Sequence, residues 1–140
     1  MTDSAATLLG AIIGGGFAIL GAYSAVKFQL ERAAKIAFVE TVHEILVGMY
    51  PEPINWPQNS WHVLHDKMPQ MQVAIYKLRF HLNSKKVTSL DTAWVKYKDY
   101  CNKINDAEIQ ARPFNQESTP SVDQKAIFKK HVDILLLFAE

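Results

Sequence analysis

The chain has 140 residues, a length that accommodates one compact domain and a separate anchor. Its 15 Lys and Arg residues nearly balance its 14 Asp and Glu residues, which excludes the general excess of positive charge typical of nucleic-acid-binding proteins. We therefore expect no nucleic-acid partner. A single cysteine, Cys101, excludes an internal disulfide, so the folded part does not require an oxidising compartment.

An uncharged apolar run from Ala5 to Val26 is the first predicted element. A helix of that length reaches ~33 Å, which is enough to cross a hydrocarbon core ~30 Å thick. Only Asp3 is charged before the run, and basic residues follow it at Lys27, Arg32 and Lys35. The positive-inside rule then predicts a single-pass membrane protein with its N-terminus outside. We expect residues 1–26 to form a transmembrane anchor and residues 27–140 a cytoplasmic helical bundle.

Two other interpretations of this run are a cleaved signal peptide and a buried helix of a soluble protein. A signal peptide begins with a basic segment, and residues 1–4 contain none. A buried core helix rarely needs such a long uncharged stretch. Glycines also weaken a helix in water, whereas lipid leaves the backbone no alternative to helical hydrogen bonds. The membrane-spanning interpretation is therefore preferred.

Small residues recur at every fourth position of the run and form one stripe along the predicted helix. They are Ala6, Gly10, Gly14, Ala18 and Ala22. Such a stripe allows the backbones of two transmembrane helices to approach closely. We expect helix association in the membrane, either in a homo-oligomer or with another membrane protein.

The helical spacing of apolar residues continues beyond the run without a polar break. It includes Leu30, Ala34, Phe38, Val42, Ile45 and Met49. Gly48 and three prolines that follow it end this helix, and residues 50–59 form a Pro-rich connector. We expect the anchor and the first helix of the body to be one long helix.

Three further helices are predicted, with no strand. The second is capped by Asn59 or Ser60, has a new start or a kink at Pro69, and carries an apolar stripe of Met71, Ile75, Leu78 and Leu82. Residues 83–86 form a polar turn. Thr88 or Ser89 then caps the third helix, whose stripe is Leu90, Trp94, Tyr97, Cys101 and Ile104.

A loop at residues 112–120 precedes the last predicted helix. Ser121 and Gln124 form its capping box, and its apolar face carries Ile127, His131, Ile134, Leu135 and Phe138. The predicted fold class is therefore all-α: an N-terminal transmembrane helix that continues into a small antiparallel helical bundle. Cys101 is expected to pack in the core of this bundle rather than to act as a nucleophile.

Basic residues gather on both sides of the predicted turn between the second and third helices. They are Lys77, Arg79, Lys85 and Lys86. A solvated helix face explains them most simply. The specific alternative is contact with the lipid bilayer, because an up-down bundle returns this turn to the membrane, where anionic lipid attracts cations.

The densest grouping of metal-ligand side chains is His62, His65 and Asp66. With His43 before it, the His65-Asp66 pair resembles the order of ligands in the HD family of metal-dependent phosphohydrolases, in which a further Asp follows. The resemblance implies a metal-dependent enzyme. That family's domain has more helices than this chain offers, and histidines on a solvated surface explain the grouping more simply. We expect no metal or cofactor.

Taken together, these features predict a membrane-anchored, non-enzymatic interaction or scaffold module that binds an unidentified cytoplasmic protein. One alternative is a small membrane-perturbing protein of the holin-like or toxin-like kind, against which the single span and the large folded body count. The other is a metal-dependent enzyme centred on His62, His65 and Asp66.

Overall fold

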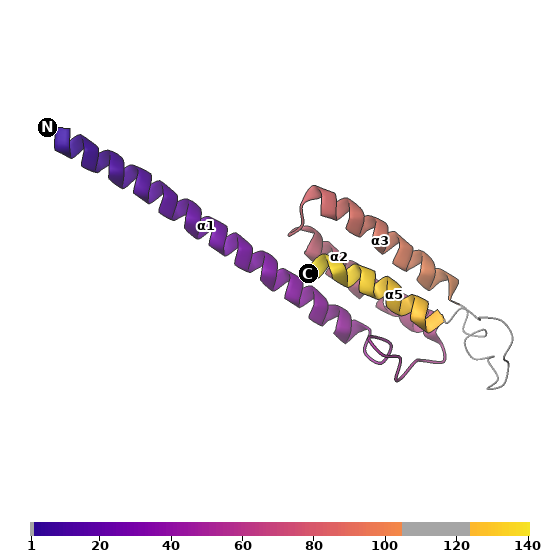
Figure 1. Ribbon diagram of the computed structural model, residues 1–140. Helices are drawn as coiled ribbons and strands as arrows, with labels where there is room; N and C mark the ends of the chain where they lie inside the picture. The colour runs from indigo at the N-terminus through magenta and orange to yellow at the C-terminus, as the bar shows by residue number, and fades with distance from the viewer. Residues whose placement is uncertain (1, 105–123) are drawn as a thin grey trace. The chain divides into compact units, whose positions relative to one another are not determined.

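The computed structural model describes residues 2–104 and 124–140. Their regular elements are all helices, with no strand among the described residues, in the order α1 (Thr2–Ile45), α2 (Ser60–Arg79), α3 (Ser84–Lys103), α5 (Gln124–Leu136) and a short 3-10 helix, η1 (Leu137–Ala139) (Figure 1). The all-α prediction is confirmed. The predicted loop at 112–120 and the cap at Ser121 lie outside the described residues. The chain divides into two compact units, Met1–Ala33 and Ala34–Glu140.

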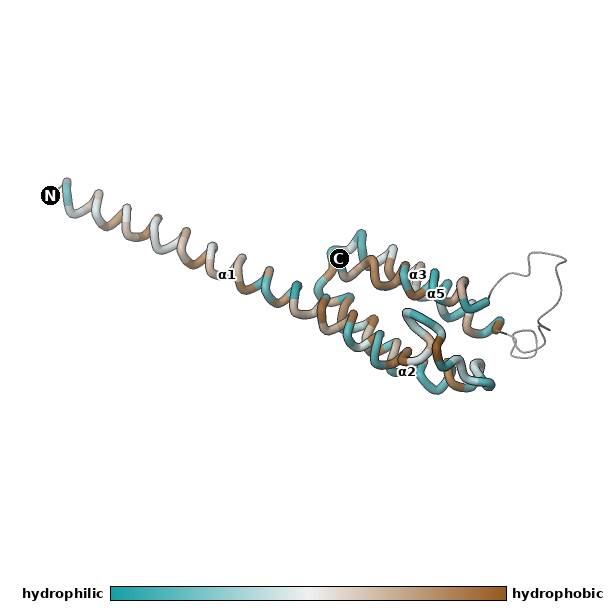
Figure 2. The backbone as a smooth tube through the Cα atoms, turned by 60° about the horizontal axis from the view of Figure 1, so that its bottom comes forward, coloured by the Kyte–Doolittle hydropathy of each residue, from teal (hydrophilic) through white to brown (hydrophobic). Residues whose placement is uncertain are grey.

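The first unit is the N-terminal part of α1. Among the described residues, α1 is the one helix that is long and apolar enough to cross a membrane. Its most apolar stretch of 18 residues has no buried residue. Neutral and hydrophobic colours follow one another along this part of the helix in Figure 2. Core helices and signal sequences pass the same test of length and composition, but a core helix would be buried. This part of α1 is therefore a candidate membrane-spanning helix.

The end of α1 has identifiable local causes. The Lys67 ammonium donates a hydrogen bond to the Ile45 carbonyl, which otherwise lacks an intrahelical partner. Gly48 then takes a φ of 85°, a left-handed conformation that glycine adopts at little cost. The Asn55 amide donates to the Gly48 carbonyl at 3.0 Å and closes the turn. The prediction that Gly48 and the prolines end this helix agrees with these contacts.

Helix α2 runs through Pro69 without interruption and begins at Ser60. Helix α3 begins four to five residues before the predicted caps, so three of the four residues of the expected polar turn at 83–86 are helical instead. The cause is Asn83, whose side chain accepts a hydrogen bond from the Lys86 amide at 2.9 Å and caps the helix. Thr88 instead lies inside α3, where its hydroxyl donates to the Ser84 carbonyl.

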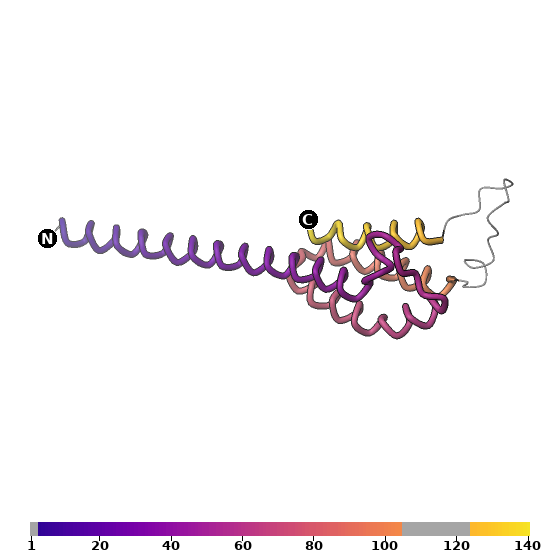
Figure 3. The backbone as a smooth tube through the Cα atoms, turned by 90° about the horizontal axis from the view of Figure 1, so that it is seen from below, coloured from indigo at the N-terminus to yellow at the C-terminus, as the bar shows by residue number. Residues whose placement is uncertain are grey.

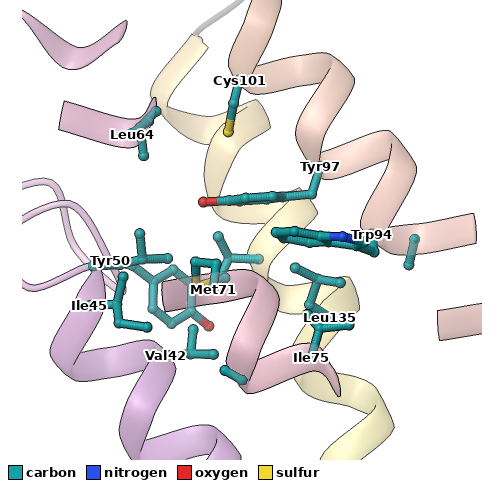
Figure 4. Close-up of a cluster of buried hydrophobic side chains, with 14 of the residues drawn as sticks. Val42, Ile45, Tyr50, Leu64, Met71, Ile75, Trp94, Tyr97, Cys101 and Leu135 are labelled. Atoms are coloured by element: carbon teal, nitrogen blue, oxygen red, sulfur yellow. The ribbon is translucent and has the colours of Figure 1, made fainter. Parts of the chain in front are cut away.

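The second unit has one hydrophobic core. The end of α1, the connector after it, α2, α3 and α5 all contribute buried side chains. Figure 4 shows part of this cluster, in which Tyr97 and Cys101 of α3 lie above Met71 and Ile75 of α2. The predicted stripe of α3 is buried as expected, and in α2 Met71, Ile75 and Leu78 are buried. Leu82 lies beyond the end of α2 and is only half-buried.

The buried face of α5 shares Leu135 with the predicted face but otherwise lies one residue away from it. Phe128, Val132 and Leu135 are fully buried, whereas Ile134 is exposed and Ile127 and His131 are half-buried. Phe128, Val132 and Leu135 are also spaced by four and three residues, so the sequence allowed a second face one residue away. The ring of Phe128 selects it by packing edge-on against Trp56, with ring centroids 5.5 Å apart.

Candidate functional site

The predicted small-residue stripe lies in the first unit, on α1. Its members, Ala6, Gly10, Gly14, Ala18 and Ala22, are all exposed. A Cβ atom added at Gly10 or Gly14 would meet no atom within 4 Å among the described residues, apart from nearby backbone of the same helix. No other described part of this chain therefore covers the stripe. Its four-residue spacing follows the ridge along which closely crossing transmembrane helices meet.

Large apolar side chains surround the stripe and are equally exposed. Among them, Leu8, Ile12, Phe17, Ile19 and Leu20 are each exposed by 63% or more. A helix that is apolar around its whole circumference and yet unburied belongs in a membrane or in a large interface. The first unit thus offers an apolar surface on which the small residues form one strip.

A groove lies in the second unit between α1 and α2. It has a volume of about 360 Å³ and is lined by Ala34 and Phe38 of α1, by Val73 of α2, and by Phe80 and His81 beyond the end of α2, among others. That volume is at the small end of the range for ligand pockets. The Phe80 side chain is 88% exposed and follows the last residue of α2.

The four basic residues predicted to face the membrane flank the α2–α3 turn. Lys77 and Arg79 lie in the last turn of α2, and Lys85 and Lys86 lie in the first turn of α3. Arg79 forms an ion pair with Asp91, with the Nη2 and Oδ2 atoms 3.2 Å apart. The charge of Arg79 is thus partly neutralised within the protein. Lys85 and Lys86 are exposed and form no ion pair in the part of the chain that the structure describes.

The histidine cluster lies in the first turns of α2. The His65 ring stacks on Trp61 with centroids 3.8 Å apart. Its Nδ1 atom lies 2.7 Å from the Trp61 carbonyl, and its Nε2 atom lies 2.7 Å from the Asn102 side-chain oxygen. Because both ring nitrogens have hydrogen-bond partners, neither is open to a metal in this arrangement. The His62 ring packs edge-on against the same tryptophan, Trp61.

No group of three or more His, Cys, Asp or Glu side chains is placed to hold a metal ion among residues 2–104 and 124–140. His62, His65 and Asp66 are neighbours in sequence without forming such a group. His43, the first residue of the resemblance to the HD family, directs its Nδ1 atom at the Val39 carbonyl of its own helix, 2.8 Å away.

A partly buried polar contact that the sequence did not indicate joins the connector to α5. The Tyr50 hydroxyl donates to Asp133 Oδ1 at 2.5 Å, and the Lys129 ammonium donates to Asp133 Oδ2 at 2.9 Å. Burial, followed by the bond to Asp133 and its charge, raises the pKa of Tyr50 well above its usual value. Burial opposes ionisation of Asp133, but the bonds from Lys129 and Tyr50 and the charge of Lys129 lower its pKa. This group acts as a structural link.

Cys101 is buried in α3 beside Tyr97. Burial raises the pKa of its thiol to about 12, against a smaller opposing effect of the hydrogen bond with Tyr97. The thiolate is the nucleophilic form, so burial disfavours the reactive state of this cysteine. The expectation that Cys101 packs in the core is confirmed.

In comparisons with known proteins, no family model matches the chain, and no curated protein or solved structure matches it either.

Proposed function

We propose that this chain is a single-pass, membrane-anchored interaction module that assembles through the small-residue stripe of α1 and is not an enzyme. The observation that carries the proposal is the complete exposure of the apolar window of α1. A buried core helix would have partners within its own chain, and the described residues provide none. Lipid and a second transmembrane helix are the surroundings that such a surface needs.

The topology of the proposal follows from charge. Basic residues flank only the C-terminal side of the apolar run, which supports an external N-terminus and a cytoplasmic second unit. We further propose that the end of α1, α2, α3 and α5 form an antiparallel bundle. The short connection of residues 80–83 and the packing of α3 against both α2 and α5 support this arrangement. The bundle then presents its surface to a cytoplasmic partner.

Crosslinking of the full-length protein in membranes tests the assembly. A cysteine introduced at Ser4, near the external end of α1, would join two copies by an oxidative disulfide. The native Cys101 can be retained, because its buried thiol does not react. Gly14→Ile adds a branched side chain to the stripe, and Gly16→Ile adds the same group ~200° around the helix.

The expected result is a crosslinked dimer in the wild-type background and in Gly16→Ile, and its loss in Gly14→Ile. Both variants add the same apolar side chain, so a general effect on insertion would change them equally. Equal crosslinking in the two variants would show that the stripe is not the contact surface. Release of the protein from membranes by alkaline extraction would refute the anchor itself.

A further inference from the structure

One end of the second unit collects features that suit a lipid surface. This is the end at which α1 enters the unit, at Ala34. The Lys35 ammonium donates to the Glu140 carbonyl at 3.0 Å, and Ala34 lines the same groove as Phe80. The α2–α3 turn and the last residues of the chain therefore lie beside the entry point of α1, as Figures 1 and 3 also show.

The connection between this end and the apolar run is short. Residues 27–33 separate Val26 from the second unit, and a helix of that length covers only ~11 Å. The polar headgroup layer is itself ~5–7 Å deep, and charges act across a further ~8–10 Å of salt solution. If the apolar run spans the bilayer, as proposed above, the tether keeps this end within reach of the headgroups.

The charge of this end complements an anionic membrane. Lys85 and Lys86 are exposed, and no ion pair neutralises them among the described residues. The one acidic residue of α3 near the turn, Asp91, is already paired with Arg79. Glu140 is an acidic residue that remains at this end. The first turn of α3 also carries the positive end of the helix dipole, which adds to the attraction.

Phe80 supplies an apolar contact in the same place. It is the most exposed of the large hydrophobic side chains that the structure describes, at 88%. A ring in this position gains from transfer into the boundary between headgroups and acyl chains, where Phe, Trp and Leu of surface-bound helices lie. Leu137, in η1 at the same end, is also exposed. A bilayer surface would cover the apolar surface that these two side chains expose to water.

We propose that the α2–α3 turn docks on the anionic headgroups of the same membrane that α1 spans, with Phe80 inserted at the interface and Lys85 and Lys86 on lipid phosphates. The second unit is thereby held against the bilayer rather than free on its tether. A reduction of anionic lipid releases it. The partner-binding surface of the unit is then the part that faces away from this end.

The test uses the full-length protein in lipid nanodiscs and a fluorophore whose emission is quenched by nitroxide-labelled headgroups. The fluorophore is attached at Ser84→Cys, beside the docking lysines, or at Val47→Cys, a residue 72% exposed in the turn that follows α1. Native Cys101 stays unlabelled because it is buried. Discs of phosphatidylcholine alone are compared with discs that also contain phosphatidylserine.

The expected result is strong quenching at Ser84→Cys and little at Val47→Cys, in phosphatidylserine discs. Lys85→Gln with Lys86→Gln should lower the ratio of docked to undocked molecules about 25-fold, since each lysine near anionic lipid contributes about 5-fold, equivalent to ~1 kcal/mol. Lys103→Gln with Lys130→Gln removes the same charge from exposed sites elsewhere and should leave quenching unchanged.

Equal quenching at the two labelled positions, or equal quenching with and without phosphatidylserine, would overturn the docking. An equal effect of the two double substitutions would overturn the role of Lys85 and Lys86. In each of these outcomes the protein remains in the disc, so the proposed anchor stands. A chain that fails to insert into discs would refute the anchor and the docking together, and sedimentation of the discs reports insertion directly.

Discussion

Replacing Phe128 by alanine removes a fully buried ring from the face by which α5 packs on the core. The Phe128 ring contacts Trp56, and its centroid lies 6.1 Å from the centroid of the Tyr97 ring. The space that the substitution leaves is therefore bounded by other large side chains. Transfer of a Phe side chain out of water accounts for about 1.5–3 kcal/mol. The unfilled cavity raises the expected loss in unfolding free energy to about 3–5 kcal/mol.

Urea unfolding of the full-length protein in a mild non-ionic detergent measures this loss, with the far-ultraviolet circular dichroism of the helices as the signal. Phe80→Ala is the matched control, because it makes the same substitution at a side chain that is 88% exposed. We expect Phe80→Ala to change the unfolding free energy by less than about 0.5 kcal/mol. A loss below about 1 kcal/mol for Phe128→Ala, or equal losses in the two variants, would refute the assigned packing of α5.

Three further substitutions test local features. The folded-state pKa of Asp133 is lowered, so its contribution to stability is present above its unfolded pKa and is lost as pH falls through the folded pKa. Asp133→Asn should therefore reduce the loss of stability on acidification, as measured by urea titrations from pH 6 downward. Asn83→Ala should cost about 0.5–2 kcal/mol, most of which Asn83→Ser should restore. Gly48→Ala should lower the unfolding free energy by about 1–3 kcal/mol, because φ is 85° and a Cβ atom would lie 3.2 Å from Asn55 Cβ. Gly10→Ala is the control and should not lower it in this way, because Gly10 faces open space.

Tyr50 adds a prediction at the alkaline end. Its folded-state pKa is raised, so the stability linked to its neutral hydroxyl is complete below the unfolded pKa of about 10 and declines above it. Tyr50→Phe removes that decline along with the bond to Asp133. Urea titrations at pH 9 and pH 11 should show a smaller difference for the variant than for the wild-type protein. An unchanged difference would contradict the assigned contact.

Much of the helical architecture is readable from the sequence because apolar spacing records which face each helix buries. The stripe of α3, from Leu90 to Ile104, is the best example, since only one face of that helix is apolar. The start of the same helix was misplaced because Asn83, Thr88 and Ser89 are all good caps, and only the geometry of the turn selects among them. In α5 two faces one residue apart are both apolar, and Phe128 decides between them through contacts with distant parts of the chain.

The candidate sites depended on long-range contacts to different degrees. The small-residue stripe and the exposed lysines are properties of single helices, so the sequence is sufficient to propose them. The sequence is not sufficient to propose the ion pair of Arg79 with Asp91 or the hydrogen bond between Tyr50 and Asp133. Each contact joins two different elements, and the second joins residues 83 apart in the chain. The histidine cluster looked like a set of ligands because of its spacing, yet Asn102 of another helix occupies one nitrogen of His65.

The contribution of α5 to the core sets an order of events during synthesis. Phe128, Val132 and Leu135 complete the hydrophobic cluster, and they are made roughly 100 residues after the apolar run, which takes about 5–20 s at ordinary rates of translation. Until then α2 and α3 expose side chains that have no cover. If the apolar run is the anchor proposed above, it is available for membrane insertion well before the second unit can close, and the chain completes its core at the membrane.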